Sequence, residues 1–342
     1  MRIALLGLPK AGKRTLLALL TGRIAPETHR VAELIEGAAR VRDLRVDRLV
    51  ELFRPRKVTY AENSFVLCPD VEDGGGREWY DDVRACDLIC FVARAFASDQ
   101  VYHPVGSVDA GRDRELLETE IVLADLERAM NRLLRIEKER KRGPSAPRNL
   151  EERALRRSME ALDAGHWLAT IPFDADERRA LQTLGLATLL PVLWVFNVDE
   201  RDLGRDYGPN SFAVSARIEK EILAIQDPAE RRDYLQALGL DGPGLDRMNR
   251  AAYDALGLMS FYTVGKDEVR AWTIRRGARA PAAGGRIHSD IERGFIRVEV
   301  IKYEDLIAAG SERAVKDQGK AQLRGREYMM EDGDVCHFLF NV

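Results

Sequence analysis

The chain has 342 residues, of which 45% are hydrophobic, and a formal net charge of −3 at pH 7. This length and this apolar fraction predict two or three domains with substantial cores. The near-neutral charge excludes a global electrostatic field for nucleic acid or membrane, so either partner would have to contact a local patch. No apolar run approaches the length that spans a bilayer, and we expect a soluble protein without a membrane partner.

The first predicted elements are a strand, a glycine-containing turn and a helix. An apolar run at residues 2–6 precedes the turn, and a helical pattern follows at residues 16–20. Gly7 and Gly12 let the backbone approach an anion, the N–H groups and the helix dipole face one concavity, and Lys13 reaches the outer phosphates. These parts form a P-loop, which predicts a site for nucleotide phosphate; the alternative is a structural strand, turn and helix that has lost its ligand. The predicted phosphate-binding residues are Gly7, Pro9, Lys10, Ala11, Gly12, Lys13, Arg14 and Thr15.

The position after the P-loop lysine departs from the usual pattern. A Ser or Thr hydroxyl normally stands there and ligates magnesium, whereas this chain has Arg14, with Thr15 one position later. In a phosphate switch, the span 23–42 would carry a threonine that senses the terminal phosphate, and Thr28 is the one threonine in it. The usual hydroxyl ligand of magnesium is therefore missing.

The strand predicted at residues 64–69 ends without the second magnesium element of a phosphate switch. That element is Asp-x-x-Gly, in which the aspartate acts on magnesium and the glycine N–H on the terminal phosphate. Here Asp70 directly follows the strand, and glycines come only at residues 74–76. The switch is thus predicted to be dismantled, and Thr15, Asp70 and Asp73 are the residues that could supply a relocated metal site.

Further elements predict a buried sheet and a helical insert. A helix is predicted at residues 44–53, and the unbroken apolar run at 87–93 fits a parallel strand covered on both faces. From residue 112 to 190 the pattern becomes helical, and a break at 143–147 turns the chain back into a returning arm at 150–162. This order predicts an antiparallel coiled-coil hairpin.

The tip of this hairpin is basic, because residues 128–157 contain eleven Lys and Arg against four Glu. One interpretation is a solvated helical face. The other is a contact with the phosphates of structured RNA. Both interpretations remain open on the sequence.

Two later strands end in polar residues at the edge where a doubly wound sheet binds its ligand. The strand at 191–196 is followed by Asn-Val-Asp-Glu at 197–200, and the strand at 212–214 by Ser-Ala at 215–216. Guanine-nucleotide proteins hold Asn-Lys-x-Asp and Ser-Ala-Lys at these places, so the guanine code is altered here. The predicted base-binding residues are Asn197, Val198, Glu200, Ser215 and Ala216.

The rest of the chain is predicted as a helical segment at 227–258 and a small α+β domain at 259–342. Alternating apolar and polar residues predict strands at 269–274 and 295–301 in this domain. We expect the domain to bind rather than catalyse, because it carries no catalytic constellation.

The cysteines do not have the paired spacing of a metal site. We interpret them as buried, reduced thiols of a cytoplasmic protein, with a redox role as the alternative. They are Cys68, Cys86, Cys90 and Cys336.

Taken together, these residues resemble the YchF-type proteins, which are Obg-related ATPases. The resemblance covers nearly the whole chain and is most specific near the C-terminus. It rests on residues 7–9, 197–200, 268–274, 287–290, 294–297, 332–335 and 338–342.

The resemblance implies an α/β fold with a P-loop domain (1–111 and 191–258) built on a doubly wound, mostly parallel sheet. A coiled-coil hairpin (112–190) interrupts this domain, and a TGS-like domain (259–342) of the α+β, β-grasp type follows it.

The resemblance also implies an activity and partners. It implies ATP or ADP as the ligand, with ATP preferred over GTP, which agrees with Glu200 in place of aspartate. It implies association with the ribosome or structured RNA through the hairpin and the TGS-like domain. His103 matches a histidine that the family assigns to the hydrolytic step, although by itself it would be an ordinary loop histidine.

The departures from the family concern magnesium and the switch, and they leave three hypotheses. The first is a divergent paralogue, at most a weak ATPase, in which the Arg14 guanidinium helps to hold an adenine nucleotide. The second is a slow but working ATPase with relocated magnesium ligands. The third is a nucleotide-free scaffold that docks on the ribosome or another RNA assembly. A monomer is expected.

Overall fold

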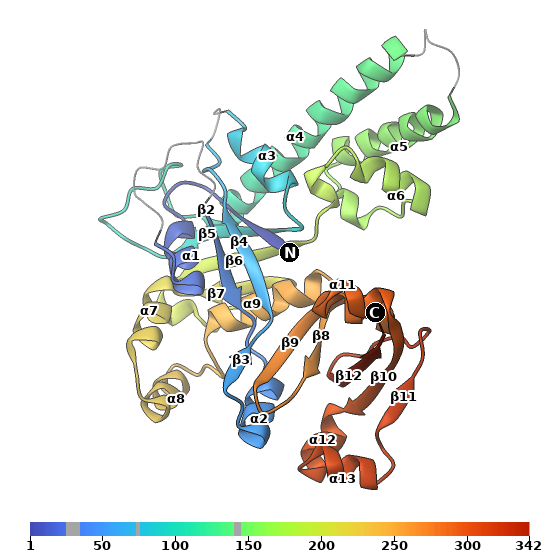
Figure 1. The fold of residues 1–342 in the computed structure, drawn as a ribbon. Helices are drawn as coiled ribbons and strands as arrows, with labels where there is room; N and C mark the ends of the chain where they lie inside the picture. Colours follow the sequence, from blue (N-terminus) through green and yellow to red (C-terminus); the bar gives the residue numbers. More distant parts are fainter. Residues whose placement is uncertain (25–34, 73–75, 140–144, 342) are drawn as a thin grey trace. The chain divides into compact units, whose positions relative to one another are not determined.

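The computed structural model describes residues 1–24, 35–72, 76–139 and 145–341. The described chain divides into two compact units, one of residues 1–38 and 64–248 and the other of residues 39–63 and 249–342. Two six-stranded sheets form the frames of the fold (Figure 1).

The sheet of the first unit is built from β1 (Arg2–Leu6), β2 (Ile35–Arg40), β4 (Glu62–Leu67), β5 (Leu88–Ala95), β6 (Val192–Val198) and β7 (Ser211–Val214). Its strand order is β2-β4-β1-β5-β6-β7. β1 pairs in parallel with β4 and β5, and β6 pairs in parallel with β5 and β7. The predicted α/β class with a mostly parallel sheet is therefore confirmed.

The central strands of this sheet are buried on both faces, which explains why continuous apolar runs mark them in the sequence. Leu5 and Leu6 on β1 are buried, as is Phe91 on β5. The Phe91 ring stacks on Trp194 of β6 with ring centroids 4.4 Å apart. This packing fixes β5 and β6 side by side, so their carboxyl ends are held together.

The helices of the first unit outside the insert are α1 (Lys13–Thr21), α3 (Glu78–Arg84), α7 (Ala216–Ala224) and α8 (Pro228–Ala237). The next helix, α9 (Gly244–Ala255), begins in this unit, and its residues from 249 onward belong to the second unit. Glu219 on α7 is buried, and its Oε1 accepts a hydrogen bond from the Gly244 N–H at the start of α9 at 2.6 Å. Burial raises the pKa of Glu219 to about 7. This carboxyl group therefore ties α7 to α9 in a place that disfavours its ionised form.

The insert contains α4 (Ala110–Glu139), α5 (Ala146–Asp163) and the shorter α6 (Ala175–Gln182), and Figure 1 shows α4 and α5 side by side. Side chains of these helices and of the segments after α5 and α6 form a core of their own: Ala129, Leu133, Ile136, Ala154, Leu155, Leu162, Leu168, Leu181 and Leu186. The returning helix begins at Ala146 rather than at residue 150, because Pro147 lies in its first turn, where proline is tolerated. The predicted break at Gly143 and Pro144 lies outside the described residues.

The sheet of the second unit is built from β3 (Lys57–Thr59), β8 (Leu258–Thr263), β9 (Glu268–Arg275), β10 (Phe295–Lys302), β11 (Gln322–Arg324) and β12 (Asp334–Phe340). Its strand order is β11-β10-β12-β8-β9-β3. The strands predicted at 269–274 and 295–301 correspond to β9 and β10. β8, β11 and β12 were not predicted from the sequence, nor was the place of β3 in this sheet, where it pairs in parallel with β9.

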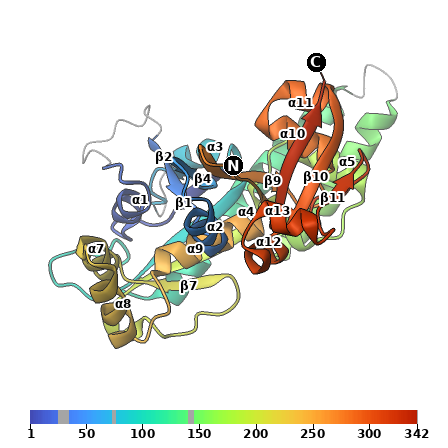
Figure 2. The same cartoon turned by 60° about the horizontal axis from the view of Figure 1, so that its bottom comes forward.

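Helices cover this second sheet: α2 (Leu44–Phe53), α10 (Ala280–Ile287), α11 (Ser289–Arg293), α12 (Tyr303–Ala309) and α13 (Glu312–Asp317). Figure 2 shows α10 and α11 beside β10 and β12, and Ala283 and Ile291 of these helices pack with Phe338 in one core. Among the described helices, we find none with an apolar stretch long enough to cross a bilayer. The four cysteines are free and buried, as predicted.

Candidate functional site

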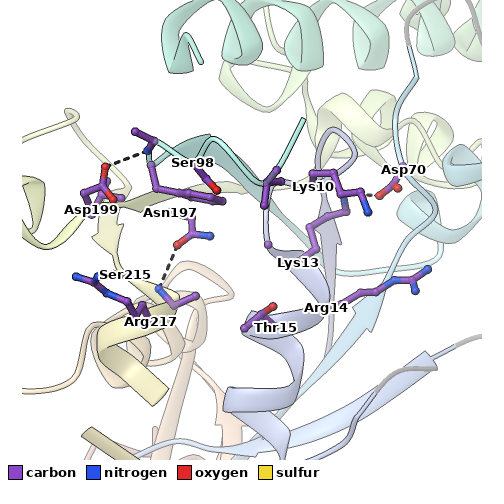
Figure 3. Close-up of a pocket in the computed structure, with 16 residues that line it drawn as sticks. Lys10, Lys13, Arg14, Thr15, Asp70, Ser98, Asn197, Asp199, Ser215 and Arg217 are labelled. Atoms are coloured by element: carbon purple, nitrogen blue, oxygen red, sulfur yellow. Dashed lines mark hydrogen bonds and ion pairs between the residues drawn. The ribbon is translucent and has the colours of Figure 1, made fainter. Parts of the chain in front are cut away.

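A cavity of about 660 Å³ opens at the carboxyl edge of the first unit's sheet. Open α/β sheets bind ligands at this edge, and the volume lies in the usual range of small-molecule sites. Figure 3 shows the side chains around it. The lining residues come from the P-loop, the segment after β4, the loop after β5 and the ends of β6 and β7: Lys10, Gly12, Lys13, Arg14, Thr15, Asp70, Phe96, Ala97, Ser98, Val101, Asn197, Val198, Asp199, Ser215, Ala216 and Arg217.

The P-loop backbone takes conformations that demand its glycines. Gly12 precedes α1 with φ of 102°, in the left-handed region, and a Cβ there would overlap Asn197 Nδ2. A Cβ at Gly7 would overlap the carbonyl oxygen of Val92. Lys10 also has a positive φ, of 65°. Gly7 and Gly12 thus let the loop backbone approach β5 and β6 more closely than side chains would allow, a conformation that fits the predicted phosphate site.

Lys13 is buried under the loop, with only 4% of its surface exposed. Its Nζ donates to the carbonyl oxygens of Gly7 at 2.8 Å and Leu8 at 2.7 Å, and it lies 2.6 Å from Asp70 Oδ1. Burial lowers the pKa of Lys13, and the adjacent Asp70 carboxylate opposes that shift. An ammonium group has three N–H donors, so each donor of Lys13 has an acceptor.

Asn197, at the carboxyl end of β6, joins two loops of the site. Its side chain is buried, Nδ2 donates to the Ala11 carbonyl oxygen at 3.1 Å, and Oδ1 accepts from the Ala216 N–H at 3.1 Å. The prediction placed Asn197 on the base. In the structure Asn197 joins the P-loop to the start of α7 through these two hydrogen bonds. It also lines the cavity, and its amide group has a second N–H, so a contact with the base stays a prediction.

The two carboxylates that follow Asn197 differ in their surroundings. Asp199 lines the cavity, and its Oδ2 accepts from the Ala97 N–H at 2.9 Å. Glu200, the residue predicted to contact the base, is not a lining residue, and its Oε2 accepts from Arg217 Nη2 at 3.3 Å. The physical reason is that Glu200 begins the 3₁₀ turn η4 (Glu200–Asp202), whereas Asp199 is still extended.

The loop after β5 contributes lining residues that the sequence analysis missed: Phe96, Ala97, Ser98 and Val101. Arg94 is almost completely buried and holds this loop by donating to the carbonyl oxygens of Phe96, Ser98, Val101 and Tyr102. The guanidinium also lies 4.5 Å from the centroid of the Phe96 ring. The sequence could have indicated that this loop lines the cavity, because the strand predicted at 87–93 ends at the edge of the sheet where ligands bind. Asp199 and Arg217 are two further lining residues that were not predicted.

Different groups line the two ends of the cavity. Figure 3 shows the P-loop cations and Asp70 at one end, and Asn197 with Ser215 at the other. The Arg14 side chain extends away from Asn197 and Ser215, toward the side on which Asp70 lies. Asp199 and Arg217 also lie at the end of Asn197 and Ser215. The cavity therefore suits an elongated ligand with one strongly anionic end and one polar end.

The predicted phosphate-binding residues divide into two groups. Those that line the cavity are Lys10, Gly12, Lys13, Arg14 and Thr15. Those that do not are Gly7, Pro9 and Ala11. Gly7 and Ala11 act through their carbonyl oxygens, which accept from Lys13 and Asn197.

The predicted metal ligands Thr15 and Asp70 both line the cavity, and Asp70 is paired with Lys13. Across the described ranges of the chain, no group of three or more His, Cys, Asp or Glu residues could hold a metal ion. Four further residues considered for the switch lie outside the described residues: Thr28, Asp73 and the glycines at 74 and 75.

His103 is buried and is not a lining residue of the cavity. Its Nε2 lies 2.9 Å from Asp113 Oδ2, and its Nδ1 accepts from the Val105 N–H at 3.2 Å. Because Nδ1 is an acceptor, the ring proton is on Nε2 and is donated to Asp113. In this arrangement His103 fixes the loop before α4, and a role in the hydrolytic step would require the loop to move.

Comparison with known proteins gives three findings. The family model YchF-GTPase_C, described as a protein of unknown function (DUF933), matches residues 258–341. The chain is 35% identical to the "Ribosome-binding ATPase YchF" of Bacillus subtilis (strain 168), and the match covers 99% of this chain and 98% of the relative. It is 33% identical to the protein of that name from Escherichia coli O157:H7, with 100% of this chain and 99% of the relative covered. The solved structure of the Schizosaccharomyces pombe YchF GTPase is similar with a TM-score of 0.85 and 26% identity, covering 99% of this chain and 97% of that one.

Proposed function

This chain belongs to the YchF family, and from that membership we propose that it binds an adenine nucleotide and associates with the ribosome. The nucleotide proposal rests on the cavity. Lys13 lies at the end that suits an anionic group, and Asn197, which is hydrogen-bonded to the P-loop, lies near the other end. The curated relatives are named ribosome-binding ATPases. That the chain acts as a monomer stays a prediction.

Adenine, rather than guanine, is supported by the position of the motif carboxylates. A guanine site needs a carboxylate that accepts from the guanine N1–H and exocyclic amine. Glu200, which stands at that place in the sequence, accepts from Arg217 instead and does not line the cavity. Asp199 accepts from the backbone of the neighbouring loop. Neither carboxylate is positioned to accept hydrogen bonds from guanine, so ATP and ADP are the proposed ligands.

Hydrolysis is proposed to be slow or absent. Phosphoryl transfer in P-loop proteins relies on magnesium to neutralise the developing charge, and the hydroxyl that normally ligates it is replaced by Arg14. The cation of the P-loop, Lys13, is already paired with Asp70. One observation favours a second candidate function, a slow ATPase with a relocated metal: Thr15 and Asp70 both line the cavity.

Ribosome association is proposed on the names of the relatives, and the hairpin gives it only partial physical support. Arg132 pairs with Glu151 at 2.6 Å, and Arg157 pairs with Glu177 at 2.8 Å. Ribosomal phosphates would have to compete with these glutamates. The basic residues 140–142 lie outside the described residues. Co-sedimentation with ribosomes at increasing salt tests the proposal, because phosphate contacts weaken steeply with salt.

Calorimetry tests the nucleotide proposal, with ATP, ADP and GTP each titrated with and without magnesium. We expect adenine nucleotides to bind more tightly than GTP and to bind without magnesium. Lys13→Ala should weaken binding by roughly tenfold or more, since hydrogen bonds to charged groups contribute about 1.5–3 kcal/mol. Lys220→Ala, on the exposed face of α7, is the matched control and should change nothing.

Three outcomes contradict parts of the proposal separately. No binding of any nucleotide favours the scaffold hypothesis. Tighter binding of GTP than of ATP refutes the base preference. Magnesium-stimulated turnover at the usual rate of P-loop ATPases refutes impaired hydrolysis.

A further inference from the structure

The ion pair between Lys13 and Asp70 places a carboxylate inside the phosphate end of the cavity. Two of the three Lys13 donors go to the backbone carbonyls of Gly7 and Leu8, which are fixed parts of the loop. The third goes to Asp70 Oδ1 at 2.6 Å. The Asp70 side chain is 42% exposed and lines the cavity, so this carboxylate faces the ligand and not the core. It is the one side-chain acceptor on Lys13 that the structure records among the described residues.

A nucleoside diphosphate and a triphosphate meet this carboxylate differently. In a P-loop the backbone N–H groups cradle the α- and β-phosphates, and the lysine reaches the β- and γ-phosphates. The β-phosphate of a diphosphate therefore lies near Lys13, but a diphosphate brings no further phosphate that must displace the Asp70 carboxylate. The terminal phosphate of a triphosphate must take the place of Asp70 on Lys13, and it then adds negative charge beside a carboxylate.

Magnesium usually removes this conflict by lying between the terminal phosphate and the nearby acidic residue. Here Arg14 stands where the magnesium hydroxyl ligand belongs, and no group of three metal-ligating residues is present in the described parts of the chain. The repulsion between Asp70 and a terminal phosphate is therefore not offset by the protein's own metal site.

We infer that Asp70 acts as an internal substitute for the terminal phosphate and makes the site selective for nucleoside diphosphate over nucleoside triphosphate. The inference rests on the proposed function, because it specifies which nucleotide the cavity takes. Its consequence is a protein whose resting ligand is ADP, and for which ATP is a weak ligand rather than a substrate to be turned over.

The test removes the charge of Asp70 and keeps its shape. Asp70→Asn can still accept a hydrogen bond from Lys13 but carries no charge. Affinities for ADP and for a non-hydrolysable ATP analogue are measured by calorimetry in EDTA. We expect wild-type protein to prefer ADP by roughly tenfold or more, and Asp70→Asn to reduce that ratio to about threefold or less, mainly through tighter binding of the analogue. Glu72→Gln removes an exposed carboxylate two residues away and should leave the ratio unchanged.

The outcomes separate this inference from the proposed function. If both nucleotides bind and Asp70→Asn leaves their ratio unchanged, the inference is overturned while nucleotide binding stands. If wild-type protein prefers the triphosphate analogue, the inference is likewise overturned. If neither nucleotide binds to either protein, both proposals fail together. Asp70→Ala, checked for an unchanged melting temperature, serves as a second variant and should shift the ratio in the same direction.

Discussion

Replacing Asn197 by alanine should loosen the nucleotide site and destabilise the unit that carries it. This one side chain joins the Ala11 carbonyl oxygen of the P-loop to the Ala216 N–H at the start of α7, at 3.1 Å in each case. Asn197→Ala removes both hydrogen bonds and leaves both backbone groups without these partners. The P-loop then loses its attachment to the start of α7.

The magnitude follows from the number and burial of these contacts. Asn197 is 5% exposed, so the groups that it satisfies are largely shielded from solvent. Two hydrogen bonds contribute about 1 kcal/mol each, and a buried group left unsatisfied costs about 1–3 kcal/mol. Water from the adjacent cavity can reach part of the space left by the side chain and bond to the exposed backbone groups. We therefore expect the unfolding free energy to fall by roughly 2–3 kcal/mol, near the low end of this range.

The assay is urea unfolding followed by tryptophan fluorescence, together with calorimetry for ADP. Three of the four tryptophans, Trp79, Trp167 and Trp194, lie in the first unit, so the signal reports mainly on that unit. Asn197→Ala should lower its unfolding free energy by the amount above and weaken ADP binding by about tenfold or more. Asn197→Asp keeps the acceptor for Ala216 but places a buried carboxylate oxygen against the Ala11 carbonyl oxygen, so its stability should be no higher than that of Asn197→Ala.

An exposed asparagine on α5 supplies the control for this experiment. Asn149→Ala should change stability by no more than about 0.5 kcal/mol, as surface substitutions usually do. If Asn197→Ala has an effect as small as that of the control and ADP affinity stays within twofold, these hydrogen bonds do not stabilise the site and the reasoning is refuted.

Two further substitutions test the charges of the first unit. Burial raises the pKa of Glu219 to about 7 from the usual 4.5, so between these pH values the folded chain binds a proton that the unfolded chain has lost. Relative to Glu219→Gln, the unfolding free energy of the wild-type protein should therefore fall by up to roughly 3 kcal/mol as pH rises through this window. Urea midpoints at pH 5 and pH 8 would detect this fall. Parallel pH profiles for the two proteins would contradict the expectation. Arg14→Ser restores the usual magnesium hydroxyl, and it should make nucleotide affinity increase on addition of magnesium by several-fold or more. Equal calorimetric affinities with and without magnesium in this variant would show that the hydroxyl alone does not rebuild the metal site.

The P-loop could be predicted from sequence because its constraints are local. Gly7, Gly12 and Lys13 act within one strand, turn and helix, and these elements lie where the pattern placed them. The parallel sheet could be predicted as well, since strands buried on both faces read as continuous apolar runs. The family resemblance, carried by motifs along the whole chain, is confirmed by the relatives.

The end of the cavity formed by Asn197 and Ser215 could not be predicted to the same degree, because it depends on the direction of individual side chains. Asp199 and Glu200 are neighbours in sequence, and only the 3₁₀ turn that begins at Glu200 decides which of them reaches the cavity wall. The loop held by Arg94 has no motif of its own and is recognisable only by its position after β5. His103 has both ring nitrogens engaged outside the cavity wall, which spacing along the chain does not reveal.

The assignment of β3 to the second unit has a practical consequence for dissecting the protein. A recombinant fragment that starts at residue 258, where the family model begins, would contain β9 without the strand that covers its outer edge. Bare edges of this kind recruit strands from other molecules and promote aggregation. Insolubility of such a truncation would then reflect the missing residues 57–59 and would say nothing against the stability of the second unit in the intact chain.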